Sequence, residues 1–220
     1  KAKGKPKKTK FITLNQAYHG TSSGAAALDG IALFNDQVSP GLPGVLHMAR
    51  PYCYRCELGK TYPSCKTDCA QELERMIKRE GADTIGAFVT EPIQGVGGVI
   101  VPPKDWLPKI REICSRHNIL MVCDEVITGF GRTGAMFASA GAGVAPDILV
   151  SAKGVTSGYL PLGLMLFKED IFETCLDAFP CIITSIISST GVRYAIALRT
   201  FWSTKKGKCL MPSGFIFKPI

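Results

Sequence analysis

The chain has 220 residues, of which 46% are hydrophobic, and 26 Lys and Arg against 18 Asp and Glu give a net charge of +8. This composition is that of a globular protein and excludes disorder throughout. No apolar run reaches the roughly 20 residues of a membrane helix, and the Lys-rich start lacks the apolar core of a secretory signal, so we expect a cytoplasmic protein.

The positive charge is concentrated at the two ends of the chain. Residues 1–10 hold six Lys and residues 181–220 hold six basic residues, and neither segment holds an acid. Residues 11–180 therefore carry 14 basic and 18 acidic residues, a net charge of −4. Residues 1–10 have no interleaved aromatic residues, so we expect a solvated basic arm that binds no nucleic acid.

The first predicted elements are a strand and a helix. Residues 10–14 (KFITL) form an apolar run that passes directly into the polar, Gly-rich loop 15–24, which is typical of a strand followed by a turn. Asp68 stands where a helix N-cap would, with Gln71 in capping-box spacing and Gly81 as the stop. The pattern predicts a helix between Asp68 and Gly81.

Three later apolar runs are predicted strands, and each is followed by a polar residue: 85–89 before Glu91, 119–123 before Asp124, and 148–152 before Lys153. A helix that Asp105 can cap lies between the first two. Continuous apolar runs indicate strands covered on both faces, and their alternation with helices predicts an α/β fold with a parallel sheet. Ligands of such sheets bind at the carboxyl ends of the strands.

The polar segments at these strand ends indicate a type of chemistry. A partly desolvated lysine can form a Schiff base, and a buried carboxylate opposite a protonated pyridine nitrogen keeps that ring an electron sink. An aromatic side chain can stack on the face of such a ring. These three groups, supplied here by Lys153, Asp124 and Tyr18, are the minimum that pyridoxal phosphate chemistry requires.

The sequence resembles the class III (omega) aminotransferases, which are fold-type I enzymes that use pyridoxal 5'-phosphate. The likeness runs from about Lys10 to about Pro180 and rests on four stretches in the family's order: AYHG (17–20), EPIQG (91–95), DEVITGFGRTG (124–134), and AKG (152–154) with GYLPLG (158–163). It implies an α/β fold-type I large domain, a mostly parallel sheet with helices on both faces. It also implies transfer of an amino group from an amino acid or omega-amine to a 2-oxo acid or aldehyde.

The resemblance assigns roles to individual residues. Lys153 would bind the cofactor covalently and shuttle the substrate proton, and Asp124 would pair with the pyridinium nitrogen. Val126 would pack on one face of the cofactor ring, and Tyr18 with its neighbour His19 would cover the other.

Further properties follow from the same resemblance. Glu91 matches the family's acidic gate residue, and family members are usually homodimers with active sites between the subunits. The same motifs serve aminomutases and amine phospho-lyases, so the reaction type stays open among these three. The expected partners are small amines and oxo acids, with no nucleic acid and no membrane.

Two parts of the family pattern have no match in this chain. Family members are longer and carry a phosphate-binding turn before the Tyr-His-Gly segment, and a Thr-containing segment and a small domain follow later. We therefore expect a fragment, inactive by itself, made of a basic arm (1–10), a partial large domain (11–180) and an unassigned tail (181–220).

Four cysteines form a rival pattern: Cys53 and Cys56 are separated by two residues, and Cys65 and Cys69 by three. Two close thiol pairs can hold a structural zinc or an iron–sulfur cluster. The short gap between the pairs favours a cysteine-rich surface loop instead. The alternative from another functional class is a non-catalytic chain that binds metal and docks a partner.

Overall fold

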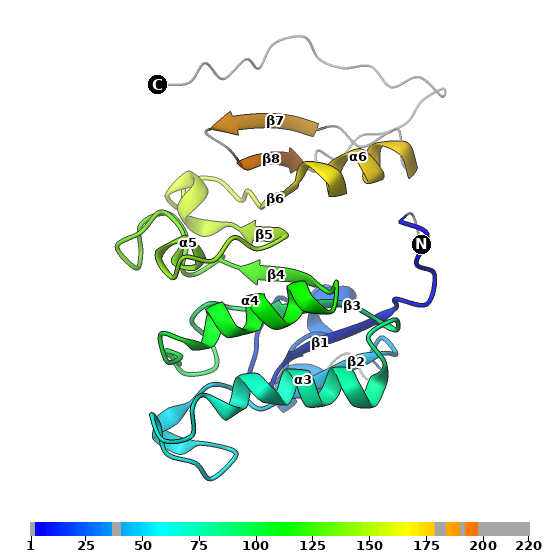
Figure 1. Ribbon diagram of the computed structural model, residues 1–220. Helices are drawn as coiled ribbons and strands as arrows, with labels where there is room; N and C mark the ends of the chain where they lie inside the picture. The colour runs from blue at the N-terminus through cyan, green and yellow to red at the C-terminus, as the bar shows by residue number, and fades with distance from the viewer. Residues whose placement is uncertain (1–2, 37–40, 179–183, 190–191, 198–220) are drawn as a thin grey trace.

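The computed structural model describes residues 3–36, 41–178, 184–189 and 192–197. These residues form one mixed sheet in the order β2-β1-β3-β4-β5-β6-β8-β7 (Figure 1). The strands are β1 (Lys10–Leu14), β2 (Val45–Met48), β3 (Ile85–Thr90), β4 (Leu120–Asp124), β5 (Ile148–Ser151), β6 (Leu164–Lys168), β7 (Thr184–Ser189) and β8 (Val192–Ala197). Apart from β7 and β8, the expected tail lies outside the described residues.

Two long helices lie side by side over the part of the sheet that contains β1 to β4 (Figure 1). Leu73 and Ile77 of α3, and Trp106 and Ile110 of α4, are at most 1% exposed and pack against the apolar face of the strands. The helices are α1 (Ser23–Ala26), α2 (Ala32–Asn35), α3 (Asp68–Glu80), α4 (Trp106–Arg116), α5 (Ala138–Gly141) and α6 (Glu169–Ala178), with short 3-10 helices η2 (Cys53–Arg55) and η3 (Lys153–Thr156). Among the described residues, no helix combines the length and apolar character needed to span a bilayer.

The predicted parallel sheet is confirmed for β2, β1, β3, β4 and β5. The next strand, β6, is antiparallel to β5, which the sequence did not predict. The connection between them, residues 152–163, contains only the four-residue η3. A parallel neighbouring strand would require a crossover connection, usually a full helix, back to the amino edge. This connection has no such helix, so β6 begins at the carboxyl edge where β5 ends.

Both predicted helices are confirmed, but their predicted side-chain caps are wrong. α3 begins at Asp68 itself, whose carboxylate is bound by Lys60 Nζ at 2.8 Å and Arg75 Nη1 at 3.1 Å. Asp105 does precede α4, but its carboxylate accepts from Lys109 Nζ at 2.6 Å. Bonds to cationic donors are stronger than bonds to a neutral N–H. Both carboxylates therefore bind nearby cations instead of the free N–H groups of the helices.

Several lysines hold the basic arm to the rest of the chain: Lys3 pairs with Asp170 and Lys10 with Glu80, and Lys8 makes the most bonds. Lys8 Nζ donates to the carbonyl oxygens of Ala82 at 2.8 Å, Ile85 at 2.9 Å and Asn118 at 3.0 Å. Burial is the largest of the effects that lower the pKa of Lys8. The expectation of a solvated arm over residues 1–10 is therefore wrong at Lys8, because three carbonyls beside β3 and β4 replace its water.

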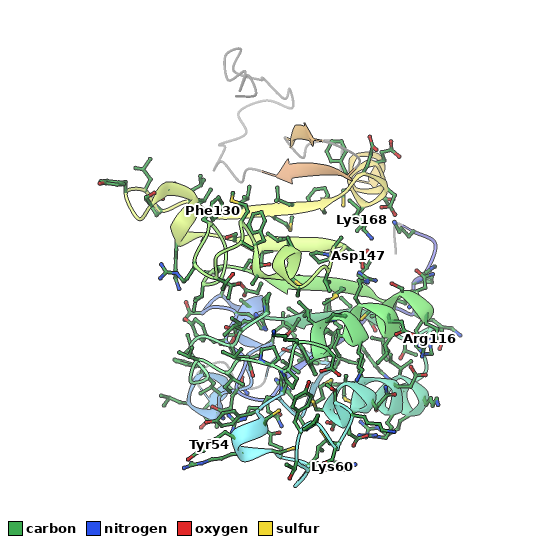
Figure 2. The ribbon with its side chains drawn as sticks, turned by 60° about the vertical axis from the view of Figure 1, so that its left-hand side comes forward. Tyr54, Lys60, Arg116, Phe130, Asp147 and Lys168 are labelled. Carbon is green, nitrogen blue, oxygen red and sulfur yellow. The ribbon has the colours of Figure 1, made fainter. Side chains whose placement is uncertain are left out.

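A buried carboxylate holds the amino edge of the sheet together. Asp147, directly before β5, accepts from Lys168 Nζ at 2.6 Å, Arg111 Nη1 at 2.7 Å and the N–H of Met121 at 2.8 Å (Figure 2). Burial raises the pKa of Asp147, but the hydrogen bonds from these three donors outweigh it and the pKa is lowered. The contacts tie α4, β4, β5 and β6 to one another.

Candidate active site

The four polar segments predicted at strand ends lie on one edge of the sheet. β1, β3, β4 and β5 are consecutive and parallel, so their carboxyl ends point the same way. Tyr18 and His19 follow β1, Glu91 follows β3, Asp124 ends β4, and Lys153 follows β5. The prediction that these residues gather at the carboxyl edge is confirmed.

Asp124 is held by a neighbouring histidine. Its Oδ2 lies 2.9 Å from His19 Nδ1, and its Oδ1 accepts the N–H of Val126 at 3.0 Å. The other ring nitrogen of His19 lies 3.3 Å from Thr13 Oγ1, so the imidazole is bound at both ends. A carboxylate has about four acceptor positions, so Asp124 keeps room for a further donor. The sequence did not indicate this His19–Asp124 pair.

Glu91 connects two loops of the site. The carboxylate is 5% exposed, and its two oxygens accept the N–H groups of Tyr18 at 3.1 Å and Gly95 at 2.8 Å. Burial raises the pKa of Glu91, and the two N–H donors offset only part of that effect. The Tyr18 ring packs against Phe34 with a centroid separation of 5.0 Å. Glu91 therefore fixes the backbone that presents Tyr18.

Asp29 is a site residue that the sequence did not reveal. It is fully buried, and its Oδ1 accepts the backbone N–H of His19. Its Oδ2 is buried without a partner among the described residues, and burial raises the pKa of this carboxyl. The only signal in the sequence is a single acid in a run of small and apolar residues, 25–30.

Lys153 begins η3 with a left-handed φ of 46° and an exposed side chain. In the parts of the chain that the structure describes, its amine takes part in no hydrogen bond or ion pair. The next residue must be small, since a Cβ on Gly154 would stand 2.8 Å from the Cβ of Phe130. The loop after β4 thus packs directly against the lysine segment.

Glu125 positions that loop and takes no part in the site itself. It is fully buried, and its carboxylate accepts from Thr128 Oγ1 at 2.7 Å and from the N–H groups of Ala138 and Ser139 at 2.8 Å each. Successive residues of a strand point to opposite faces, which explains why Asp124 faces His19 while its neighbour holds the loop.

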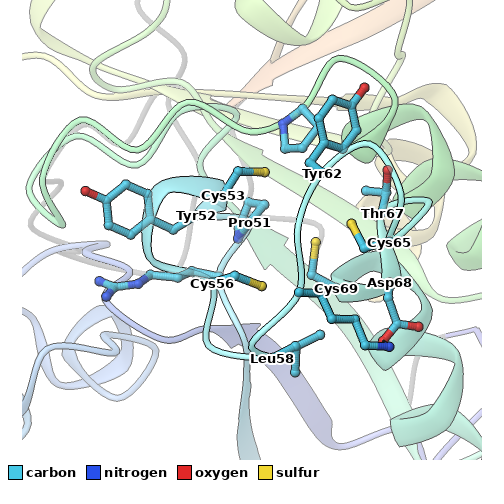
Figure 3. Close-up of a pocket in the computed structure, with 13 residues that line it drawn as sticks. Pro51, Tyr52, Cys53, Cys56, Leu58, Tyr62, Cys65, Thr67, Asp68 and Cys69 are labelled. Atoms are coloured by element: carbon cyan, nitrogen blue, oxygen red, sulfur yellow. The ribbon is translucent and has the colours of Figure 1, made fainter.

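The four cysteines lie in and just after the connection that leaves the carboxyl end of β2, which is parallel to β1. They surround a cavity of about 10 Å³ between η2 and the start of α3 (Figure 3). All four are free thiols. Within the described ranges, no three His, Cys, Asp or Glu side chains are arranged as metal ligands.

Comparison with known proteins gives a consistent result. The family model for class-III aminotransferases matches residues 1–178. An adenosylmethionine-8-amino-7-oxononanoate aminotransferase of Geobacter sulfurreducens is 42% identical over 177 residues, which cover 80% of this chain and 39% of that protein. A putrescine–pyruvate aminotransferase of Pseudomonas aeruginosa is 44% identical over 172 residues, covering 78% and 38%.

Solved structures agree with the sequence relatives. An amine transaminase from an uncultivated Pseudomonas species, crystallised in its PLP-bound form, superposes with a TM-score of 0.77 at 44% identity, over 80% of this chain and 40% of that one. The chain spans about two fifths of the length of these relatives. The predicted α/β fold-type I architecture is confirmed, and the alternative of a non-catalytic metal-binding chain finds no support among the relatives.

Proposed function

This chain belongs to the class-III aminotransferase family, and we propose that the protein containing it is a pyridoxal phosphate-dependent transaminase. It transfers an amino group from an amino acid or omega-amine to a 2-oxo acid or aldehyde. One observation carries the proposal. A buried carboxylate with spare acceptor positions, Asp124, ends β4, and the neighbouring strand β5 leads to Lys153, whose amine has no bond within the described residues.

The residues present fit the cofactor. Asp124 accepts only two hydrogen bonds among the described residues, so it can also accept the N–H of a protonated pyridine ring. The amine of Lys153 is free to react with an aldehyde. When bound, pyridoxal phosphate supplies an electron sink for the charge that remains on a substrate carbon after it loses a proton.

In this proposal each side chain has a separate task. Lys153 would bind the cofactor covalently and move the substrate proton through its Nζ, while Asp124 would accept the N–H of the positive ring nitrogen. Val126 and Tyr18 would pack against the ring. His19 is a positioning residue, since its contact with Asp124 orients the carboxylate.

Glu91 is proposed as the gate beside the substrate. Its carboxylate now holds the N–H groups of Tyr18 and Gly95. Because burial raises its pKa, this carboxyl takes up a proton more readily than an exposed one. A cationic substrate that enters the site would pair with the ionised Glu91 carboxylate. In this role, the charge of the substrate determines the position of the Glu91 side chain.

A homodimer and a cytoplasmic location are parts of the proposal. The connection after Lys153 exposes three large apolar side chains: Tyr159 (88%), Leu160 (69%) and Leu162 (40%). Such an apolar group beside a site suits a contact with a second subunit. Sedimentation of the purified protein should give a dimer, and Leu160→Asp should weaken it; a monomer at all concentrations would contradict this part.

The central assignment is tested by covalent trapping. The purified chain is incubated with pyridoxal phosphate, reduced with borohydride and digested, and the peptide masses are measured. We expect the phosphopyridoxyl mass on the Lys153 peptide and none there in Lys153→Ala. Lys78→Ala, which removes an exposed helix lysine, is the matched control and should label like the unmodified chain. A folded chain that labels other lysines equally would overturn the proposal.

A further inference from the structure

The connection from β2 to α3, residues 49–67, lacks a core of its own. Its only regular element is η2, and most of its side chains between 53 and 66 are exposed. Loops of this length without secondary structure are uncommon in compact domains and usually have a function. The cysteine pattern, which the aminotransferase site does not use, lies entirely in this connection and the first turn of α3.

The fold brings the two thiol pairs together. Cys53 begins η2 and Cys56 directly follows it, whereas Cys65 lies in the turn before α3 and Cys69 in the first turn of α3. All four line the same cavity, and their sulfur atoms are directed into the space between them (Figure 3). The cavity of about 10 Å³ has room for about one atom of the size of water.

The second thiol pair is fixed to the helices. Lys66 and Thr67 both have left-handed backbones, with φ of 50° and 62°. Lys109 of α4 donates to the carbonyl oxygen of Lys66 at 2.9 Å, and Thr67 Oγ1 donates to the carboxylate of Asp105. Two strained residues persist only where their surroundings hold them. The turn that carries Cys65 is therefore firmly docked, while η2 has no comparable anchor to α3.

We propose that Cys53, Cys56, Cys65 and Cys69 bind one zinc ion, which fastens η2 to the start of α3. Four thiolates in two close pairs are the donor set of tetrahedral structural zinc sites. Each S–H bond breaks as a sulfur–zinc bond forms, and the protons pass to solvent. The resulting centre of charge −2 lies at the amino end of α3, which favours negative charge.

Binding requires the thiols to move inward, because no three of them have metal-ligand geometry in the described structure. Cys53 is exposed and Cys56 and Cys65 are half-buried, so these side chains can rotate toward Cys69. The exposed position of η2 allows the same closure.

The zinc also affects the neighbouring site. Glu57, which directly follows Cys56, accepts from Asn15 Nδ2 at 2.8 Å. The carbonyl of Asn15 accepts from Gln94 Nε2 at 3.0 Å. Asn15 begins the loop that leads to Tyr18 and His19. A zinc ion that fixes η2 therefore also restricts the motion of this loop. The metal site itself does not depend on the proposed transaminase activity.

Metal content tests the proposal directly. The full chain is purified under reducing conditions with zinc in the medium, dialysed, and analysed for metals and free thiols. We expect one zinc per chain, and at least a tenfold lower content in the double variant Cys56→Ser/Cys65→Ser. Cys175→Ser, which removes a half-buried thiol of α6 outside the cluster, is the matched control and should retain its zinc.

A second measurement covers the case in which the double variant does not fold. Cobalt added to the metal-free, unmodified chain should give the charge-transfer and visible bands of tetrahedral cobalt bound to thiolates, and zinc should abolish them. Zinc should also protect residues 52–67 from proteolysis. A folded, reduced chain without zinc, a disulfide between these cysteines, or iron with sulfide in place of zinc would each overturn the proposal.

Discussion

The two edges of the sheet both hold buried carboxylates, but they stabilise them differently. At the amino edge, Asp147 is surrounded by Lys168 and Arg111, and its pKa is lowered. At the carboxyl edge, Glu91 is held by two neutral N–H groups, and its pKa is raised. The amino edge therefore neutralises its buried charge with cations of the chain itself, whereas the carboxyl edge does not, which is consistent with the proposed binding of a ligand there.

The same contrast applies to the lysines. Lys168 and Lys8 of the amino edge are fully engaged with a carboxylate and three carbonyl oxygens, respectively. Lys153 of the carboxyl edge has no such bond among the described residues. Substitutions at the two edges should therefore separate loss of activity from loss of stability.

The largest effect is expected for Lys153→Ala. Without its amine the site has neither the covalent attachment of the cofactor nor the proton-transfer group, so transamination by the longer protein that contains this chain should fall by about 10²–10⁴-fold. The free energy of unfolding should change by less than about 0.5 kcal/mol, because the side chain is exposed. Activity assays and urea denaturation of the same samples measure both. A variant with near-normal activity would contradict the role of Lys153.

Asp147→Asn should give the opposite result. It leaves Lys168 and Arg111 without their counter-charge, but their side chains are 40% and 18% exposed, so water partly replaces the lost partner and the cost is about 1–3 kcal/mol. Urea denaturation should show this loss, while cofactor attachment at Lys153 persists in the folded fraction. A loss below about 1 kcal/mol would mean that this carboxylate does not hold the amino edge together.

The pH dependence of Asp147 has a definite sign. Because its folded pKa lies below the usual value, its stabilisation is present above the unfolded pKa of about 3.9 and is lost as the pH falls through the folded pKa. The unmodified chain should therefore lose more stability below about pH 4 than Asp147→Asn does. If the unmodified chain and Asp147→Asn lost stability equally as the pH falls, the ion pairs of Asp147 would not explain the acid sensitivity.

His19→Ala should have an intermediate effect on cofactor binding. It removes one of the two bonds that orient Asp124 and leaves a buried acceptor unsatisfied, a cost of about 1–3 kcal/mol. We expect the dissociation constant of pyridoxal phosphate to rise about 5–150-fold, with the attachment point unchanged. His19→Asn, whose amide can reach the position of Nδ1, should recover part of the affinity. Equal affinities for Ala and Asn would indicate that the ring only fills space.

The smallest effect is expected for Glu91→Gln. A raised folded pKa means that protonation favours the folded state, so stability should increase as the pH falls through that pKa toward the unfolded value of about 4.3. The gain is about 1.4 kcal/mol for each unit by which the pKa is raised, and Glu91→Gln should lack it. Unfolding measured between pH 4 and about pH 7 would detect the difference. Identical pH profiles of stability for the unmodified chain and Glu91→Gln would show that the charge of Glu91 does not affect the free energy of unfolding.

Much of the framework was predictable because its signals are local. Apolar runs such as 85–89 and 119–123 identify strands covered on both faces, and the polar residue after each run marks the edge where ligands bind. The apolar stripes of α3 and α4 identify those helices in the same way. The likeness of four short motifs to one family then indicated which cofactor to expect.

The contacts within the site were not predictable from local patterns. His19 and Asp124 are 105 residues apart, and nothing near either one indicates the other. Asp29 is buried and bound to the backbone N–H of His19, 10 residues earlier in the chain, which no local pattern indicates. The predicted cap at Asp68 failed for a related reason, since Lys60 and Arg75 provide competing charges that a capping motif does not take into account.

The antiparallel turn from β5 to β6 has a consequence for how this scaffold could diversify. Because both strands open onto the same edge, all of the connection 152–163 remains on the ligand side, and no crossover helix limits its length. Residues added or exchanged between Gly154 and Gly163 would change the surface beside Lys153 while the strand register stays the same. A family that uses one cofactor for many amines could obtain new substrate preferences from this one segment.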